Sequence, residues 1–313
     1  MQTLLAQSPG IRNNPFQTQM RSGLMHPGAV ARALWFAQRY RLKRLLGIPS
    51  RPCSPVLEGG MNSAVERYRR ICRTLLASMP NPMPSDFTAA EIGFGDCLAS
   101  ADMMLGLGAR HIHLVEHQAL PLSSLHLRAL EMTRAADLPN QAKLLLPGEP
   151  PKLNPSLATL HAGLLEKIVL PSPVDLVYSF DVLEHVEDLP AFFTSCHRML
   201  KPGGWSLHKF DLSGHEFFED PMPPLDFQTY PRWLYRLMFP RYRRAVGNFA
   251  DQFVRAMKDC GFEILRMTPL RQAEPSYLTQ IRPQLRPEAR ARGDEVLGLL
   301  DLVILAQRPV ESP

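Results

Sequence analysis

The stretch "LHKFDLSGHEFFED" carries three polar residues at a spacing suited to removing a proton from a substrate. His208 comes three residues before Asp211, and His215 follows four residues after it. A histidine titrates near neutral pH, and a carboxylate beside it can hold its ring ready to accept a proton. We therefore predict that His208 and Asp211 form a general base and its orienting residue, with His215 and the separate His185 as further candidates.

The same residues also have structural interpretations, and the sequence leaves these open. A buried histidine can bond backbone or hydroxyl groups and order a loop without taking part in chemistry. Asp211 can cap or orient a neighbouring turn. The spacing of these histidines and carboxylates is not that of a helical metal motif, so we predict no metal site.

A second group of residues is suited to binding a nucleotide. In "EIGFGDCLAS", Gly93 and Gly95 allow a tight turn from a strand into a helix, whose free amide groups can bind a ligand. Glu116 lies 21 residues past Gly95, where a carboxylate can accept hydrogen bonds from ribose hydroxyls. Two glycines are a weak signal, and the pattern fits any cofactor that contains adenosine.

The surrounding sequence indicates the elements that position these residues. Apolar runs typical of strands alternate with amphipathic runs typical of helices, which predicts an α/β fold with a mostly parallel sheet and helices on both faces. Ligands bind such sheets at the carboxyl ends of the strands. Gly93, Glu116 and the residues after Phe180 should therefore share one edge. The predicted strands are residues 87–94, 111–116, 174–180, 204–212, 262–267 and 299–308.

One segment is more specific than the glycine turn. The stretch "VDLVYSFDVLEHVEDLPAFFTSCHRMLKPGGW" (174–205) resembles the class I S-adenosylmethionine-dependent methyltransferases, in particular the branch typified by enzymes of ubiquinone and menaquinone biosynthesis. The resemblance extends over residues 61–308. It implies a Rossmann-like fold with a seven-stranded sheet, and S-adenosylmethionine (SAM) as the cofactor.

The resemblance also implies roles for individual residues. The glycine turn would line the methionine part of SAM, Glu116 would bind its ribose, and the end of the fourth strand would lie beneath the methyl-transfer site. The implied cofactor-binding residues are Glu91, Gly93, Gly95, Asp96, Glu116, Phe180 and Asp181. The sequence departs from the family at Cys97, where a third small residue is usual, and near His161, where an acidic residue is expected.

We interpret the protein as an enzyme that methylates a small molecule, on oxygen in preference to nitrogen or carbon. The acceptor would be a hydroxyl or carboxylate of a metabolite or of a glycan- or lipid-linked precursor. An RNA methyltransferase is an alternative, although "SFDV" stands where enzymes that methylate adenine carry an Asn/Asp-Pro-Pro-aromatic motif. A non-catalytic SAM-binding protein is a third possibility, and a nicotinamide dehydrogenase is disfavoured.

An insertion rich in aromatic residues and arginines, residues 212–248, follows the fifth predicted strand. A connection of this length is typical of a lid or a binding element, although its aromatic residues can also form the core of a small helical unit. Arginine beside aromatic rings favours a flat or acyl acceptor that carries a carboxylate or phosphate. We predict that the insertion is a substrate lid.

The amino-terminal part of the chain is basic. Eight arginines and lysines precede the first acidic residue, Glu58. We predict an arm over residues 1–60 with a helix near 29–47, a main domain over 61–308 and a tail at 309–313. The arm could pack on the domain, contact an anionic membrane or nucleic acid, or act as a transit peptide.

The overall composition is that of a globular protein, with 45% hydrophobic and 21% charged residues. The five cysteines form no CxxC pair, so we expect neither a disulfide framework nor a structural zinc site. No apolar run approaches the roughly 20 residues that a membrane-spanning helix needs. We expect a cytoplasmic protein, and the sequence does not determine its oligomeric state.

Overall fold

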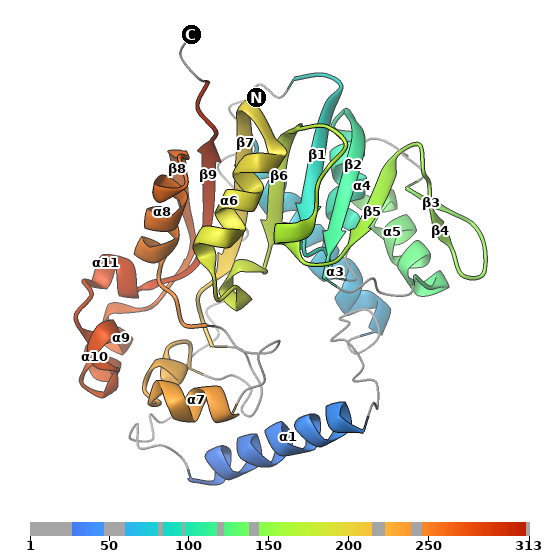
Figure 1. Ribbon diagram of the computed structural model, residues 1–313. Helices are drawn as coiled ribbons and strands as arrows, with labels where there is room; N and C mark the ends of the chain where they lie inside the picture. Colours follow the sequence, from blue (N-terminus) through green and yellow to red (C-terminus); the bar gives the residue numbers. More distant parts are fainter. Residues whose placement is uncertain are drawn as a thin grey trace.

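The computed structural model describes residues 27–46, 60–80, 84–95, 98–117, 122–137, 144–214, 223–238 and 246–310. Its centre is a seven-stranded sheet in the order β5-β2-β1-β6-β7-β9-β8 (Figure 1). Strand β9 runs antiparallel to β7 and β8, and the other neighbouring pairs are parallel. The predicted Rossmann-like fold with a mostly parallel seven-stranded sheet is therefore confirmed. The strands are β1 (Phe87–Ile92), β2 (Ala109–Glu116), β5 (Ala158–Ala162), β6 (Val174–Phe180), β7 (Leu200–Asp211), β8 (Glu263–Gln272) and β9 (Leu299–Gln307).

Helices cover both faces of this sheet, because side chains along each strand alternate between two apolar cores. On β1, Ala89 belongs to the core beneath α3, α4 and α5, and Ala90 belongs to the core beneath α6 and α8. None of the described helices is long and apolar enough to cross a membrane. The covering helices are α3 (Gly60–Ser78), α4 (Ala99–Gly106), α5 (Ser124–Asp137), α6 (Leu189–Met199) and α8 (Ala250–Asp259), with a short turn η1 (Leu165–Lys167) and a hairpin of β3 (Leu145–Leu146) and β4 (Lys152–Leu153) beside them.

The order of the strands reverses at the middle of the sheet. From β1 the chain adds β2 and β5 on one side and then β6 and β7 on the other, where β8 forms the edge and β9 lies between β7 and β8. In open α/β sheets such a reversal leaves a crevice at the carboxyl ends of the two central strands. Strands β1 and β6 end at Ile92 and Phe180, so the glycine turn and the residues after Phe180 begin at this crevice.

The insertion after β7 packs against the helix of the amino-terminal arm. Helix α1 (Pro27–Leu45) lies against α7 (Arg232–Met238), as Figure 1 shows below the sheet. Val30 and Leu34 of α1 contact an apolar cluster of the insertion. This packing favours the first of the three interpretations of the arm. The cluster consists of Phe227, Tyr230, Leu234, Tyr235 and Met238.

A group of short helices between β8 and β9 supports the insertion from the other side. Its apolar residues form one cluster with Leu225 and Phe249, which lie on either side of α7 in the sequence. The hydroxyl of Tyr277 also accepts a hydrogen bond from the backbone N–H of Leu225, at 2.9 Å. The sequence pattern did not predict these helices because each is too short to show a period. They are α9 (Pro275–Ile281), η5 (Arg282–Gln284), α10 (Pro287–Arg290) and α11 (Asp294–Leu297), and the insertion adds η3 (Asp226–Gln228).

Several strands differ from the predictions. Strand β8 extends to Gln272 instead of ending at residue 267, and the hairpin of β3 and β4 was not predicted. Strand β5 was not predicted, because its sequence "ATLHA" lies at the edge of the sheet, is largely exposed and lacks a strand-like apolar run. Strand β7 begins at Leu200 instead of residue 204, because residues of "LKPGG" join it through an irregular pairing with β6. Gly203 has a φ of +79° in this irregular part. The predicted domain limits at residues 60, 61 and 308 stay predictions.

Candidate active site

The turn between β1 and α4 depends on two glycines in the left-handed region. φ is +71° at Gly93 and +59° at Gly95, values at which other residues are strained. A Cβ atom at Gly93 would lie 2.6 Å from Cγ2 of Val182, so sterics also require glycine there. An added Cβ at Gly95 would meet no atom within 4 Å. The backbone of the turn is therefore open to close approach by a ligand at Gly95.

The carboxylate of Glu116 binds this turn to the end of β2. Its Oε2 accepts a hydrogen bond from the backbone N–H of Gly95 at 3.0 Å, and its Oε1 accepts one from the N–H of His117 at 2.8 Å. A carboxylate can accept about four hydrogen bonds, so Glu116 keeps capacity for donors from a ligand. The 21-residue spacing in the sequence therefore corresponds to a direct contact in the structure.

Glu91 lies in the core rather than on the surface of the turn. It is 2% exposed, and its two carboxylate oxygens accept hydrogen bonds from the hydroxyls of Ser100 (2.5 Å) and Tyr178 (2.9 Å). Burial raises the pKa of Glu91 to about 7, against the lowering effect of these two bonds. Glu91 therefore joins β1, the first turn of α4 and β6. The predicted contact with the methionine part of SAM stays a prediction.

The turn η2 (Leu183–His185) directly follows β6 and lies beside the glycine turn. The contact at Gly93 fixes this placement, because Val182 immediately precedes η2. Glu184 is 3% exposed, and neither of its carboxylate oxygens has a hydrogen-bond partner among the residues that the structure describes. Burial and the nearby carboxylates of Asp181 and Asp211 raise the pKa of Glu184 well above its usual value. His185, next to it, is partly exposed.

A chain of ion pairs runs along the same edge of the sheet. Lys209 is buried between Asp181 (2.5 Å) and Asp301 (2.9 Å). Arg271 continues the chain, with its Nε 2.7 Å from Asp301 and a terminal nitrogen 3.3 Å from Asp211. Burial alone would lower the pKa of Lys209, but the two carboxylates outweigh burial and raise it. These three carboxylates and two cations give the edge a net negative charge.

The predicted base His208 does not fit this geometry. Its side chain is fully buried, and the hydroxyls of Ser179 and Ser206 lie 2.7 Å from its Nδ1 and Nε2. Its ring packs against the rings of Phe192 and Phe193 beneath α6. Burial lowers the pKa of His208 to about 3, so the ring is neutral at physiological pH. We therefore correct the assignment: His208 is a core residue.

The other predicted residues are distributed differently. Asp211 accepts hydrogen bonds from the N–H (3.0 Å) and the hydroxyl (2.5 Å) of Ser213, so it orders the chain after β7 and cannot orient His208. Phe180 ends β6, and the ammonium of Lys209 lies 5.2 Å from its ring centroid. Asp181 has a φ of +55°. Asp96, Cys97 and His215 lie outside the described residues.

The comparison with known families agrees with this arrangement. The family described as "Methyltransferase domain" matches residues 121–207, from just before α5 to the middle of β7. This match supports SAM-dependent methyl transfer as the activity of the chain. The predicted SAM-dependent methyl transfer and the predicted cofactor are thereby confirmed, whereas the acceptor and the assignment to the branch of ubiquinone and menaquinone biosynthesis stay predictions. No curated protein matches the chain.

Solved structures of methyltransferases are similar to this chain at low sequence identity. A SAM-dependent methyltransferase from Mesorhizobium loti is 18% identical, with a TM-score of 0.44 over 80% of this chain and 100% of that one. Phosphoethanolamine N-methyltransferase 2 from Haemonchus contortus, in complex with SAM, is 14% identical (TM-score 0.46, covering 80% and 57%). The N-methyltransferase NodS from Bradyrhizobium japonicum, in complex with S-adenosyl-L-homocysteine, is 13% identical (TM-score 0.39, covering 78% and 86%).

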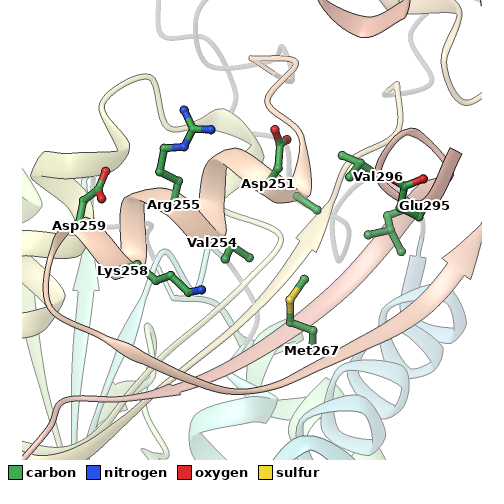
Figure 2. A pocket seen from close by; sticks show the side chains of 10 residues that line it. Asp251, Val254, Arg255, Lys258, Asp259, Met267, Glu295 and Val296 are labelled. Atoms are coloured by element: carbon green, nitrogen blue, oxygen red, sulfur yellow. The ribbon is translucent and has the colours of Figure 1, made fainter. Parts of the chain in front are cut away.

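A groove of about 480 Å³ lies away from this site, on the outer side of the sheet. Figure 2 shows it between α8, which contributes Asp251 and Arg255, the edge strand β8, which contributes Met267, and α11, which contributes Glu295. None of the predicted site residues lines it. The candidate active site is therefore the crevice at the carboxyl edge.

The sequence reasoning missed several charged residues of this edge. Lys209, Asp301 and Arg271 lie on three different strands, and their pairing follows from the register of β7, β8 and β9. Glu184 lies inside "LEHV", within the stretch that carries the resemblance. A glutamate four residues after the end of a predicted strand was the available signal.

The contact between Gly93 and Val182 predicts a local effect on cofactor binding. In Gly93→Ala the new Cβ must displace the Val182 side chain, and the alanine must keep a positive φ. Together these two effects cost about 1–3 kcal/mol of stability in the turn. We expect the Kd for SAM, measured by calorimetry, to rise at least about ten-fold. Gly108→Ala is the matched control: its φ is +101° and its surroundings are open, so it should lose stability and keep SAM affinity. Equal affinities in both variants would contradict this account.

The raised pKa of Glu91 predicts a dependence of stability on pH. The carboxyl titrates near 4.5 in the unfolded chain and near 7 in the folded protein, so the unfolded chain loses its proton first. The free energy of unfolding should therefore fall as the pH rises through this window, by roughly 3 kcal/mol from this group. Urea unfolding of the wild type and of Glu91→Gln from pH 4.5 to 8 measures the difference. Parallel curves for the two proteins would show that Glu91 does not titrate in this way.

Proposed function

We propose that the protein transfers the methyl group of SAM to an oxygen of a small-molecule acceptor, a hydroxyl or a carboxylate. The observation that carries the proposal is the contact of Val182 with Gly93. It brings η2, with its buried carboxyl and its partly exposed histidine, against the turn that would hold the cofactor. The turn that would bind SAM and the side chains that could accept a proton from the acceptor thus lie next to each other at one edge of the sheet.

The residues of the glycine turn fit the cofactor. The backbone at Gly95 would approach its methionine part, and the spare acceptor capacity of Glu116 suits the two ribose hydroxyls. The net negative charge of the edge near Asp181 favours a cationic ligand. When bound, SAM supplies an electrophilic methyl group on a positively charged sulfur.

The acceptor side of the site would consist of His185 and Glu184. A hydroxyl acceptor loses a proton during methyl transfer, and His185 is placed after β6 to accept it. The carboxyl of Glu184, for which the described residues offer no partner, would bond the acceptor and fix its orientation. Orientation supplies much of the rate in a displacement between two bound molecules.

The proposal predicts a selective loss of turnover in His185→Ala. The protein is incubated with methyl-labelled SAM and a cell extract, and labelled products are identified by mass spectrometry. We expect a product labelled on oxygen, a rate about 10²-fold lower in His185→Ala, and an unchanged Kd for SAM. His111→Gln, at the amino end of β2, is the matched control and should keep the wild-type rate. A label on nitrogen or carbon, or no binding of SAM, would reject the proposal.

We also propose that α1 contacts an anionic membrane surface. The helix contains five arginines and lysines and no acidic residue, and its inner face, with Ala37, is buried. Its outward side chains include Leu42 together with Trp35 and Leu45, which are 58% and 84% exposed, and Leu46 directly after the helix is exposed as well. Exposed tryptophan and leucine beside basic residues are typical of helices that lie in a membrane interface.

Sedimentation with lipid vesicles tests this contact. We expect the protein to sediment with phosphatidylglycerol vesicles and much less with phosphatidylcholine vesicles, and to lose binding at high salt. A variant with Trp35→Ser and Leu42→Ser should stay in the supernatant. Leu76→Ser removes an exposed leucine from α3 and should bind as the wild type does. Equal sedimentation of all three proteins would exclude α1 as the binding element.

A further inference from the structure

Three arginine side chains converge on a small pocket beside the candidate active site. Arg232 and Arg236 are four residues apart on α7 and so share one face of the helix, and Arg286 follows η5 in the connection from β8 to β9. The pocket is lined by these arginines together with Tyr235 and Val246, and holds a volume of about 10 Å³. This is room for about one oxygen-sized atom.

Positive charge exceeds negative charge at this pocket. Glu288 is the carboxylate that faces the arginines within the described part of the chain: its Oε1 lies 2.7 Å from Nε of Arg232 and 3.6 Å from Nε of Arg286. The sequence from Tyr230 to Ala250 adds no acidic residue. One carboxylate cannot neutralise three guanidinium groups, so the pocket keeps a net positive charge.

Arg286 is the least exposed of the three, and one of its nitrogens lacks a hydrogen-bond acceptor. It is 7% exposed, one terminal nitrogen donates a hydrogen bond to Oε1 of Gln228, and its buried Nε has no hydrogen-bond partner among the described residues. A buried donor without an acceptor costs about 1–3 kcal/mol. Burial, together with the nearby charges of Arg232 and Arg236, lowers the pKa of Arg286. An anion at the pocket would supply the missing acceptor and relieve this repulsion.

The pocket adjoins the acceptor side of the site. The backbone N–H of Val246, which lines the pocket, donates a hydrogen bond of 2.7 Å to the backbone carbonyl of Glu184. The following residue, Gly247, has a φ of +83°, and a Cβ there would lie 3.1 Å from a terminal nitrogen of Arg286. The arginine pocket and η2 are therefore neighbours, joined by this backbone hydrogen bond.

We propose that Arg232, Arg236 and Arg286 bind a carboxylate or phosphate group of the methyl acceptor. This inference rests on the proposed function. One oxygen of the anion enters the pocket and accepts from Arg286, and the other oxygens bond the more exposed guanidinium groups of α7. Arginine forms paired, charge-assisted hydrogen bonds with both kinds of anion. The anionic group anchors the acceptor at α7, so that its reacting oxygen lies beside η2.

The first experiment uses inorganic phosphate and acetate as probes on the full chain. The Nε–H signals of labelled arginines are followed by NMR during each titration, with chloride at matched ionic strength as the reference. We expect phosphate or acetate to shift arginine signals of the wild type, and its Kd to rise at least about ten-fold in Arg232→Gln with Arg236→Gln. The matched control, Arg255→Gln, lies on the exposed face of α8 and should bind as the wild type does. Equal responses of all proteins, or the same response to chloride, would overturn the proposal.

The second experiment separates this proposal from the proposed function. The labelled product obtained with cell extract should carry a carboxylate or phosphate, and Arg236→Gln should raise KM for the acceptor about ten-fold with kcat and the Kd for SAM unchanged. A neutral acceptor, or an unchanged KM, would overturn the arginine site while methyl transfer stands. Failure to bind SAM would overturn the proposed function, and the phosphate titration would still report on the pocket.

Discussion

The position of the glycine turn after β1 depends on one buried carboxyl, that of Glu91. Its two oxygens accept hydrogen bonds from a hydroxyl of α4 and a hydroxyl of β6, so Glu91 ties both elements to strand β1. A carboxyl in the core is costly unless it is protonated or fully bonded, and this one is bonded at both oxygens, with a pKa of about 7. The glycines can then occupy the left-handed region, because the residues before and after the turn are fixed.

The reversed strand β9 gives the edge its charge. Because β9 is antiparallel to β7, its first residues meet the last residues of β7, and Asp301 is placed opposite Asp211. Lys209 can therefore bridge Asp301 and Asp181, which belong to different strand ends. In a wholly parallel sheet the first residues of the last strand would lie at the opposite edge. The antiparallel strand β9 thus supplies Asp301, which holds Lys209 in position to pair with Asp181 directly after β6.

The sequence predicted what depends on local spacing. The glycine turn, the acid at Glu116 and the strand before η2 were found because each has a pattern within one strand or within one strand–helix–strand unit. The failure at His208 also has a local cause. Successive side chains of a strand alternate between its faces, so residues 208 and 211 on one strand point to opposite sides and cannot pair. His208 shares its face with Phe210, which belongs to the core under α6 and α8.

Contacts between segments that are distant in the sequence could not be predicted from it. The ion pairs of Lys209 and Arg271 require the register of three strands, and the packing of α1 on α7 joins segments about 200 residues apart. A charged residue has no preferred partner until the fold brings one near, so neither pattern nor propensity identifies these pairs. The short helices after β8 fall below the length at which a period is visible.

Helix α7 connects α1 to the arginine pocket, because its side chains pack against both. Leu234, Tyr235 and Met238 pack in the cluster that α1 contacts, while Arg232 and Arg236 face the pocket near η2. Glu288 pairs with Arg232, so the unit between β8 and β9 holds the arginine face in place. Val246, which lines the same pocket, donates its backbone N–H to the backbone carbonyl of Glu184. Contacts through α7 therefore link α1, the part of the arm that the structure describes, to the arginine pocket and to η2.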